Sequence, residues 1–137
     1  MENVTEIKTK IYLIFTLLLI LFPFGSLAKT FENLYVAEVL VPNETNRELL
    51  AGSRAGLAQV LVRVSGSRAI QENDVIVEAL NKSDSYYYQY GYESSEELIF
   101  YEGDLTRALK LRLSYEPSVI AELLRRADLP VWGSNRP

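Results

Sequence analysis

The residues best suited to acid–base chemistry are carboxylates that gather around one predicted loop. They are Glu93, Glu96, Glu97, Glu102 and Asp104. Paired carboxylates can act as general acid and base, and carboxylates at suitable spacing bind Ca²⁺. The spacing here matches no calcium loop, and a run of charges is usually a solvated loop. We therefore predict no catalytic residue and no metal site, and keep a hydrolase that uses these carboxylates as the alternative.

Histidine and cysteine are both absent from the sequence. Without histidine, the chain lacks the usual general base at neutral pH and the commonest zinc ligand. Without cysteine, it has no disulfide, no thiolate metal site and no cysteine nucleophile. These two absences favour a binding protein over an enzyme, and no cofactor is expected.

Tyrosines alternate with other residues in the stretch SYYYQYGYE and supply four candidate binding residues, Tyr86, Tyr88, Tyr90 and Tyr92. A period of two predicts a strand with one aromatic face. Such a face binds a glycan or a protein, or packs under a helix with its hydroxyls at the rim, and we expect the packing. Nucleic acid is not expected as a partner because the net charge is −4.

The stretch ADLPVWGSNRP holds the only tryptophan, Trp132, and a further candidate binding residue, Arg136. An exposed tryptophan could stack on a sugar or a partner, but its commonest use is to pack on the core, so we expect an anchor. Arg63 and Arg68 flank Gly66 near a predicted helix end. Arginine there usually satisfies the helix dipole and the last carbonyls, so an anion site is the minor alternative.

Residues 1–28 have the pattern of a secretory signal. A segment with two lysines precedes the apolar run IYLIFTLLLILFPF, and small residues then lead to a cleavage point between Ala28 and Lys29. The alternative is an uncleaved inner-membrane anchor, although the run is shorter than the roughly 20 residues of a span. We expect an exported, periplasmic protein whose membrane contact is limited to the signal segment before cleavage.

The elements that must position these residues follow from apolar periodicity. Residues 29–33 are expected as a disordered lead, and a single domain is expected over 34–137. The strand 34–41 is apolar on both faces, as a central strand would be. Thr45 and Glu48 fit a capping box for a helix that ends near Ser65. The remaining elements expected are a short helix over 74–81 capped by Asn73, strands over 85–93, 98–101 and 108–115, and a helix from Pro117.

This order predicts an α+β fold in which two main helices pack on a small, mostly antiparallel sheet. It matches a ferredoxin-like plan that lacks its last strand, so the domain is expected to be truncated at its C-terminus. The glycines Gly52 and Gly56 lie inside the longest predicted helix, and we expect them to allow close packing against the sheet.

Three stretches of the sequence resemble the bacterial domain-of-unknown-function 2066 family (DUF2066). They are GLAQVLVRVSGSRAI, YYYQYGYE and LKLRLSYEPSVIAELLRRADLPVWGSNRP. The resemblance covers about residues 34–137 and implies an exported protein that is usually longer. It implies no activity, cofactor or site residue.

Together these features predict an uncharacterised exported envelope protein that binds rather than catalyses. The expected partner is another envelope protein or the remainder of a longer parent chain. A missing last strand would leave a sheet edge open to strand addition, so residues 29–137 alone are expected to self-associate or to melt at low temperature. The alternatives are an envelope hydrolase that needs no histidine or cysteine, and a glycan-binding domain.

Overall fold

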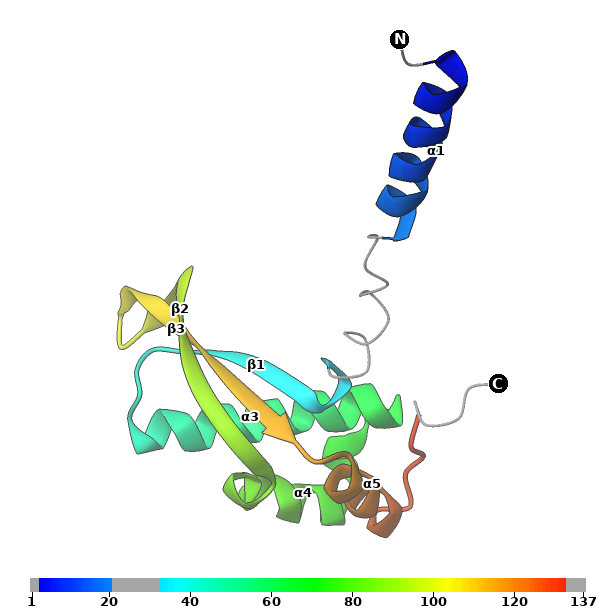
Figure 1. The fold of residues 1–137 in the computed structure, drawn as a ribbon. Coiled ribbons are helices and arrows are strands. Elements are labelled where there is room, and N and C mark those ends of the chain that lie inside the picture. Colours follow the sequence, from blue (N-terminus) through cyan, green and yellow to red (C-terminus); the bar gives the residue numbers. More distant parts are fainter. Residues whose placement is uncertain (1–2, 21–32, 133–137) are drawn as a thin grey trace.

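The structure, a computed structural model, describes residues 3–20 and 33–132. Helices and strands alternate along it in the α+β pattern that the sequence predicts (Figure 1). The elements in chain order are α1 (Val4–Ile20), the 3-10 turn η1 (Asn33–Tyr35), β1 (Val36–Val41), α3 (Asn46–Ser65), η2 (Ile70–Glu72), α4 (Asp74–Asn81), η3 (Ser83–Ser85), β2 (Tyr87–Tyr101), β3 (Asp104–Tyr115) and α5 (Pro117–Arg126).

The strands form one antiparallel sheet in the order β1-β3-β2. Because β1 and β2 each pair antiparallel with β3, they run parallel to one another on either side of it. Over the described residues, this order and these directions match the first three strands of a ferredoxin-like arrangement. The prediction that β1 is a central strand is wrong. β3 occupies the centre because it forms a hairpin with β2 and also pairs with β1.

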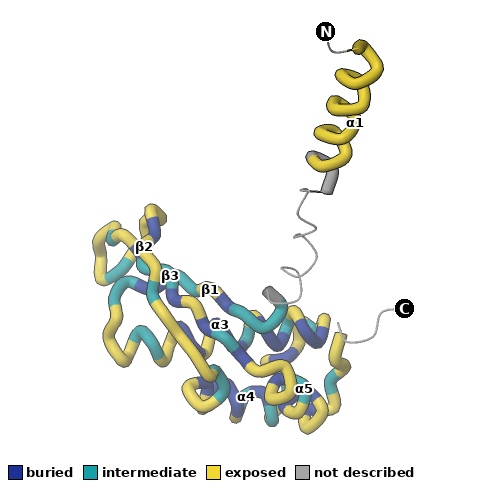
Figure 2. The backbone as a smooth tube through the Cα atoms, viewed as in Figure 1, coloured by how far each residue is buried: buried dark blue, intermediate teal, exposed yellow. Residues whose placement is uncertain are grey.

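α3, α4 and α5 cover one face of the sheet, and the core lies between the two layers (Figure 1, Figure 2). The buried apolar residues of this core all fall between Ala37 and Ala127, so the segment 29–137 contains the whole core. Leu57 and Leu61 of α3 are fully buried in this core, whereas Leu50 near the start of the helix is 49% exposed.

The start of α3 differs from the predicted capping box. The Thr45 side chain makes no cap hydrogen bond. Its hydroxyl and its backbone N–H both donate to Asn43 Oδ1, over 2.6 and 3.0 Å. The Glu48 carboxylate accepts a hydrogen bond from the Tyr101 hydroxyl at 3.3 Å. The other end agrees with the prediction, because Gly66 adopts a left-handed conformation with φ 70° and its N–H donates to Val62 O.

Gly52 and Gly56 bring α3 close to the sheet, as predicted. A Cβ atom on Gly56 would lie 2.5 Å from Leu113 Cδ1 and 3.2 Å from Ala37 Cβ. A Cβ atom on Gly52 would lie 2.6 Å from Leu111 Cδ2. Only glycine allows this helix–sheet spacing without moving a buried side chain.

β2 is one long strand where the sequence predicted two strands and a polar break. The register with β3 shifts between Tyr87 and Gln89 and again between Ser94 and Leu98. The predicted break at 94–97 is therefore an irregularity within a continuous strand. A bulge of this kind adds residues to one strand only and bends it.

α1 covers much of the predicted signal segment, and its described side chains over 3–17 are exposed. Among the described residues, no helix combines the length and the apolar character needed to cross a membrane. The predicted cleavage point at Ala28 and Lys29 and the lead over 29–32 lie outside the described residues. Asn33, expected to end the lead, begins the turn η1.

Candidate functional site

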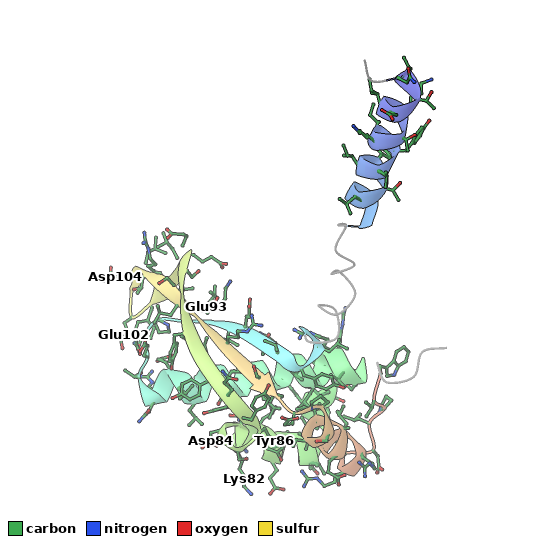
Figure 3. The ribbon with its side chains drawn as sticks, viewed as in Figure 1. Lys82, Asp84, Tyr86, Glu93, Glu102 and Asp104 are labelled. Atoms are coloured by element: carbon green, nitrogen blue, oxygen red, sulfur yellow. The ribbon has the colours of Figure 1, made fainter. Side chains whose placement is uncertain are left out.

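The predicted acidic group does not converge on one point. Glu102 and Asp104 flank Gly103 in the tight turn between β2 and β3, where both carboxylates are exposed. Glu93 lies farther along β2, opposite Lys110 (Figure 3). Over the described ranges 3–20 and 33–132, no cluster of metal-ligating side chains is formed.

The candidate tyrosines do not share one strand face. The extra residue near Tyr88 shifts the alternation, so Tyr87 joins Tyr90 and Tyr92 on the side that faces the helices. Their rings contact edge-to-face, with centroids 5.5 Å apart for Tyr87 and Tyr90 and 6.0 Å apart for Tyr90 and Tyr92. Burial, and then the neighbouring Tyr90, raises the pKa of both Tyr87 and Tyr92. The prediction of a single face made of Tyr86, Tyr88, Tyr90 and Tyr92 is wrong.

The two remaining tyrosines lie apart from this cluster. Tyr86 precedes β2 near the helical layer, and its hydroxyl accepts a hydrogen bond from Arg126 at 3.3 Å (Figure 3). Tyr88 is 61% exposed. The rings of the cluster meet edge-to-face, and Tyr86 and Tyr88 lie apart from it, so these tyrosines do not form one flat surface.

Trp132 packs against the end of α3. Its indole ring lies beside Gly66, 3.7 Å from the point where a Cβ atom would stand, and its backbone N–H donates to Val64 O. The ring is 54% exposed, so it covers the C-terminus of α3 rather than filling the core. Arg136 lies outside the described residues.

Arg63 ties α3 to β1. Its Nη1 donates to Val36 O at 2.8 Å and to Leu34 O at 3.3 Å. Arg68 lines a groove of about 540 Å³ with Arg63 on the flank of α3, together with Ala55, Ala58, Gln59, Val62, Ile70 and Gln71.

The sequence predicted an open sheet edge but did not indicate that β1 would form it. β1 is apolar on both faces except at Glu38, whose carboxylate pairs with Arg112 at 3.1 Å and Lys110 at 3.7 Å across the outer face. An apolar edge strand is a template for pairing with another strand. No strand in the described part of the chain lies beside β1 on the side away from β3.

A second exposed feature, not predicted, is the apolar end of the β2–β3 hairpin. Phe100 and Leu105 pair across the two strands and are 74% and 68% exposed, and Leu98 is 60% exposed. The signal was present in the run LIFY, which is apolar at every position and therefore exposes an apolar side chain on either face.

Comparison with known proteins assigns the chain to a different family from the one that its sequence suggested. Residues 28–133 match the family model described as Domain of unknown function (DUF8605). Searches of curated proteins and of solved structures find no match. The assignment to DUF2066 is wrong. The stretches that suggested it form parts of α3, β2, β3 and α5, and their apolar periods of helix and strand are ones that many α+β domains share. The chain belongs to the DUF8605 family, whose model covers its whole α+β domain.

Proposed function

We propose that this protein is an exported, periplasmic domain of the cell envelope that is not catalytic and binds another protein along the free edge of β1. The observation that carries the proposal is the mismatch between the composition of β1 and its position. The segment VAEVLV has the apolar character of a strand covered on both sides, yet it forms one edge of the sheet. Strand addition by a partner would give β1 the neighbour that its sequence suits.

The support for export is the N-terminal pattern of lysines, apolar run and small residues. The test is the mass of the protein recovered from the periplasm of cells that express the full chain. We expect a mature N-terminus at Lys29. Protein that keeps residues 1–28 and fractionates with the membrane would replace this part of the proposal with an uncleaved anchor.

Binding at the β1 edge can be tested in cells with a photoreactive amino acid in place of Leu40. The matched control carries the same photoreactive group at Arg125, an exposed position on α5. We expect one discrete protein adduct from position 40 that is absent from position 125. The same adducts from both positions, or none from position 40, would contradict binding at this edge.

A further inference from the structure

We propose that the protein bound at the β1 edge is a second copy of this chain, paired strand to strand and antiparallel about a two-fold axis at Val39. This inference rests on the proposed function, because it names the partner at the same edge. It follows from the direction of the backbone groups of β1, from the registers that they permit, and from the side chains that each register brings together.

Arg63 shows which backbone groups of β1 face the free edge. Its Nη1 donates to the carbonyls of Leu34 and Val36, which lie two residues apart. A carbonyl bonded to this guanidinium points away from β3. Because backbone groups alternate in direction along a strand, Glu38 and Leu40 also direct their N–H and C=O groups to the free edge.

Five two-fold registers, with axes at residues 36 to 40, let outward-facing residues of β1 pair with outward-facing residues of another β1. Axes at Val36, Ala37 and Glu38 all need the Val36 carbonyl, which already bonds to Arg63, and the axis at Glu38 also sets two Glu38 carboxylates side by side. An axis at Leu40 pairs Glu38 with Pro42, which has no N–H to donate. An axis at Val39 pairs Glu38 of each copy with Leu40 of the other copy. In this register the outward N–H and C=O groups of both residues all form hydrogen bonds across the junction.

The side chains of this register are complementary on both faces of the sheet. On the face covered by helices, Val39 meets its own copy and Ala37 meets Val41. On the outer face, Glu38 meets an apolar Leu40, whose neighbour on β3 is Lys110. Lys110 of the second copy then lies two strands away from Glu38, roughly 9–10 Å across the sheet, and like charges do not face each other directly.

The flank of α3 leaves room for the second copy. Ala55, Ala58 and Val62 line the groove there. Arg63 lines the same groove and bonds to the edge of β1, so the two surfaces are continuous. β1 then becomes an interior strand of one continuous sheet built from two three-stranded ones.

The test is sedimentation of residues 29–137, wild type and two variants of opposite charge, from micromolar to millimolar concentration. Wild type is expected to form a dimer. Leu40→Glu sets Glu beside Glu38 of the second copy at two symmetric places, and should weaken the dimer by at least about tenfold. Leu40→Lys sets Lys beside Glu38 at the same places, and should leave the dissociation constant within about threefold of wild type.

Each outcome separates the inference from the proposed function. Equal weakening by both variants would overturn this register, and a wild type that stays monomeric would overturn the second copy whether or not Leu40→Glu folds. If wild type is monomeric and the photoreactive group at position 40 captures a different protein, the proposed function stands and this inference fails. If there is neither dimer nor adduct, both fail.

Discussion

At Gly56, the backbone of α3 packs so closely against the sheet that no side chain fits between them. Gly56 faces Leu113, Ala37 and the hydroxyl of Tyr115 at distances that leave no room for a methyl group. The sequence predicted this role, because a glycine inside a strongly apolar helix costs helix stability unless close packing compensates. It could not predict which side chains of the sheet would be met.

Gly56→Ala is expected to lower the free energy of unfolding by about 1–2 kcal/mol, because overpacking outweighs the gain in helix propensity. Urea unfolding of residues 29–137 measures it. Gly91→Ala is the matched control, since a Cβ atom there meets nothing within 4 Å. Equal stability of Gly56→Ala and wild type would contradict the close approach of α3 to the sheet.

Tyr115 carries a hydroxyl that is buried and has no hydrogen-bond partner among the described residues. Burial raises the pKa of Tyr115 above its ordinary value of 10.0. The neutral phenol is therefore favoured in the folded state. The stability that depends on the neutral Tyr115 phenol is fully present below pH 10.0. Above that pH, the unfolded chain releases the proton and stability is lost.

Tyr115→Phe is expected to leave stability at pH 7 unchanged or raised, because it removes an unsatisfied buried polar group. It should also reduce the loss of stability as the pH rises above 10.0. Thermal unfolding between pH 7 and pH 11 measures both effects, with Tyr88→Phe at an exposed side chain as the control for loss of one hydroxyl. A clear destabilisation at pH 7 would mean that the hydroxyl has a partner.

At the scale of elements, the two helix starts show when a capping signal can be trusted. Asn73 was predicted to cap α4, and its side chain accepts hydrogen bonds from the N–H groups of Val75 and Ile76 at 3.0 and 3.3 Å. Thr45 was predicted by the same reasoning and does not cap α3. A nearby asparagine, Asn43, binds its hydroxyl instead, and that competition depends on the turn after β1.

Asn73→Ala is therefore expected to cost about 1–2 kcal/mol of unfolding free energy, which is the usual value of a working cap. The Asn73 amide also donates to Ala127 O at 2.8 Å, and the substitution removes this link between α4 and the end of α5. Thr45→Ala, the matched control, should cost clearly less. Equal costs for the two substitutions in thermal unfolding would contradict the difference between these caps.

β2 shows where periodicity fails as a guide to the candidate site. Alternation alone put Tyr86, Tyr88, Tyr90 and Tyr92 on one face, and a single irregularity moved Tyr87 into the cluster and Tyr88 out of it. Because strand side chains alternate with a period of two, one extra residue reverses the face of everything before it. No local pattern in SYYYQYGYE marks that position.

At the scale of the whole molecule, the sequence predicted the fold class and, apart from the division of β2 into two strands, the order of elements, because both depend on local apolar periods. It placed β1 in the centre of the sheet, because it is apolar on both faces. Position in a sheet depends on which strands pair across the chain, and here β3 takes the centre. The conflict between the composition of β1 and its position is the observation that supports the proposed binding of a partner at this edge.

Amide hydrogen exchange along β1, measured by NMR on residues 29–137 in dilute and concentrated solution, tests the central claim most directly. Ala37, Val39 and Val41 point their N–H groups to β3 and should be protected at both concentrations. Glu38 and Leu40 should exchange rapidly when dilute and become protected when concentrated, as a second β1 pairs with the edge. Rapid exchange of Glu38 and Leu40 at every concentration, or protection already in dilute solution, would contradict a free β1 edge that binds a second copy.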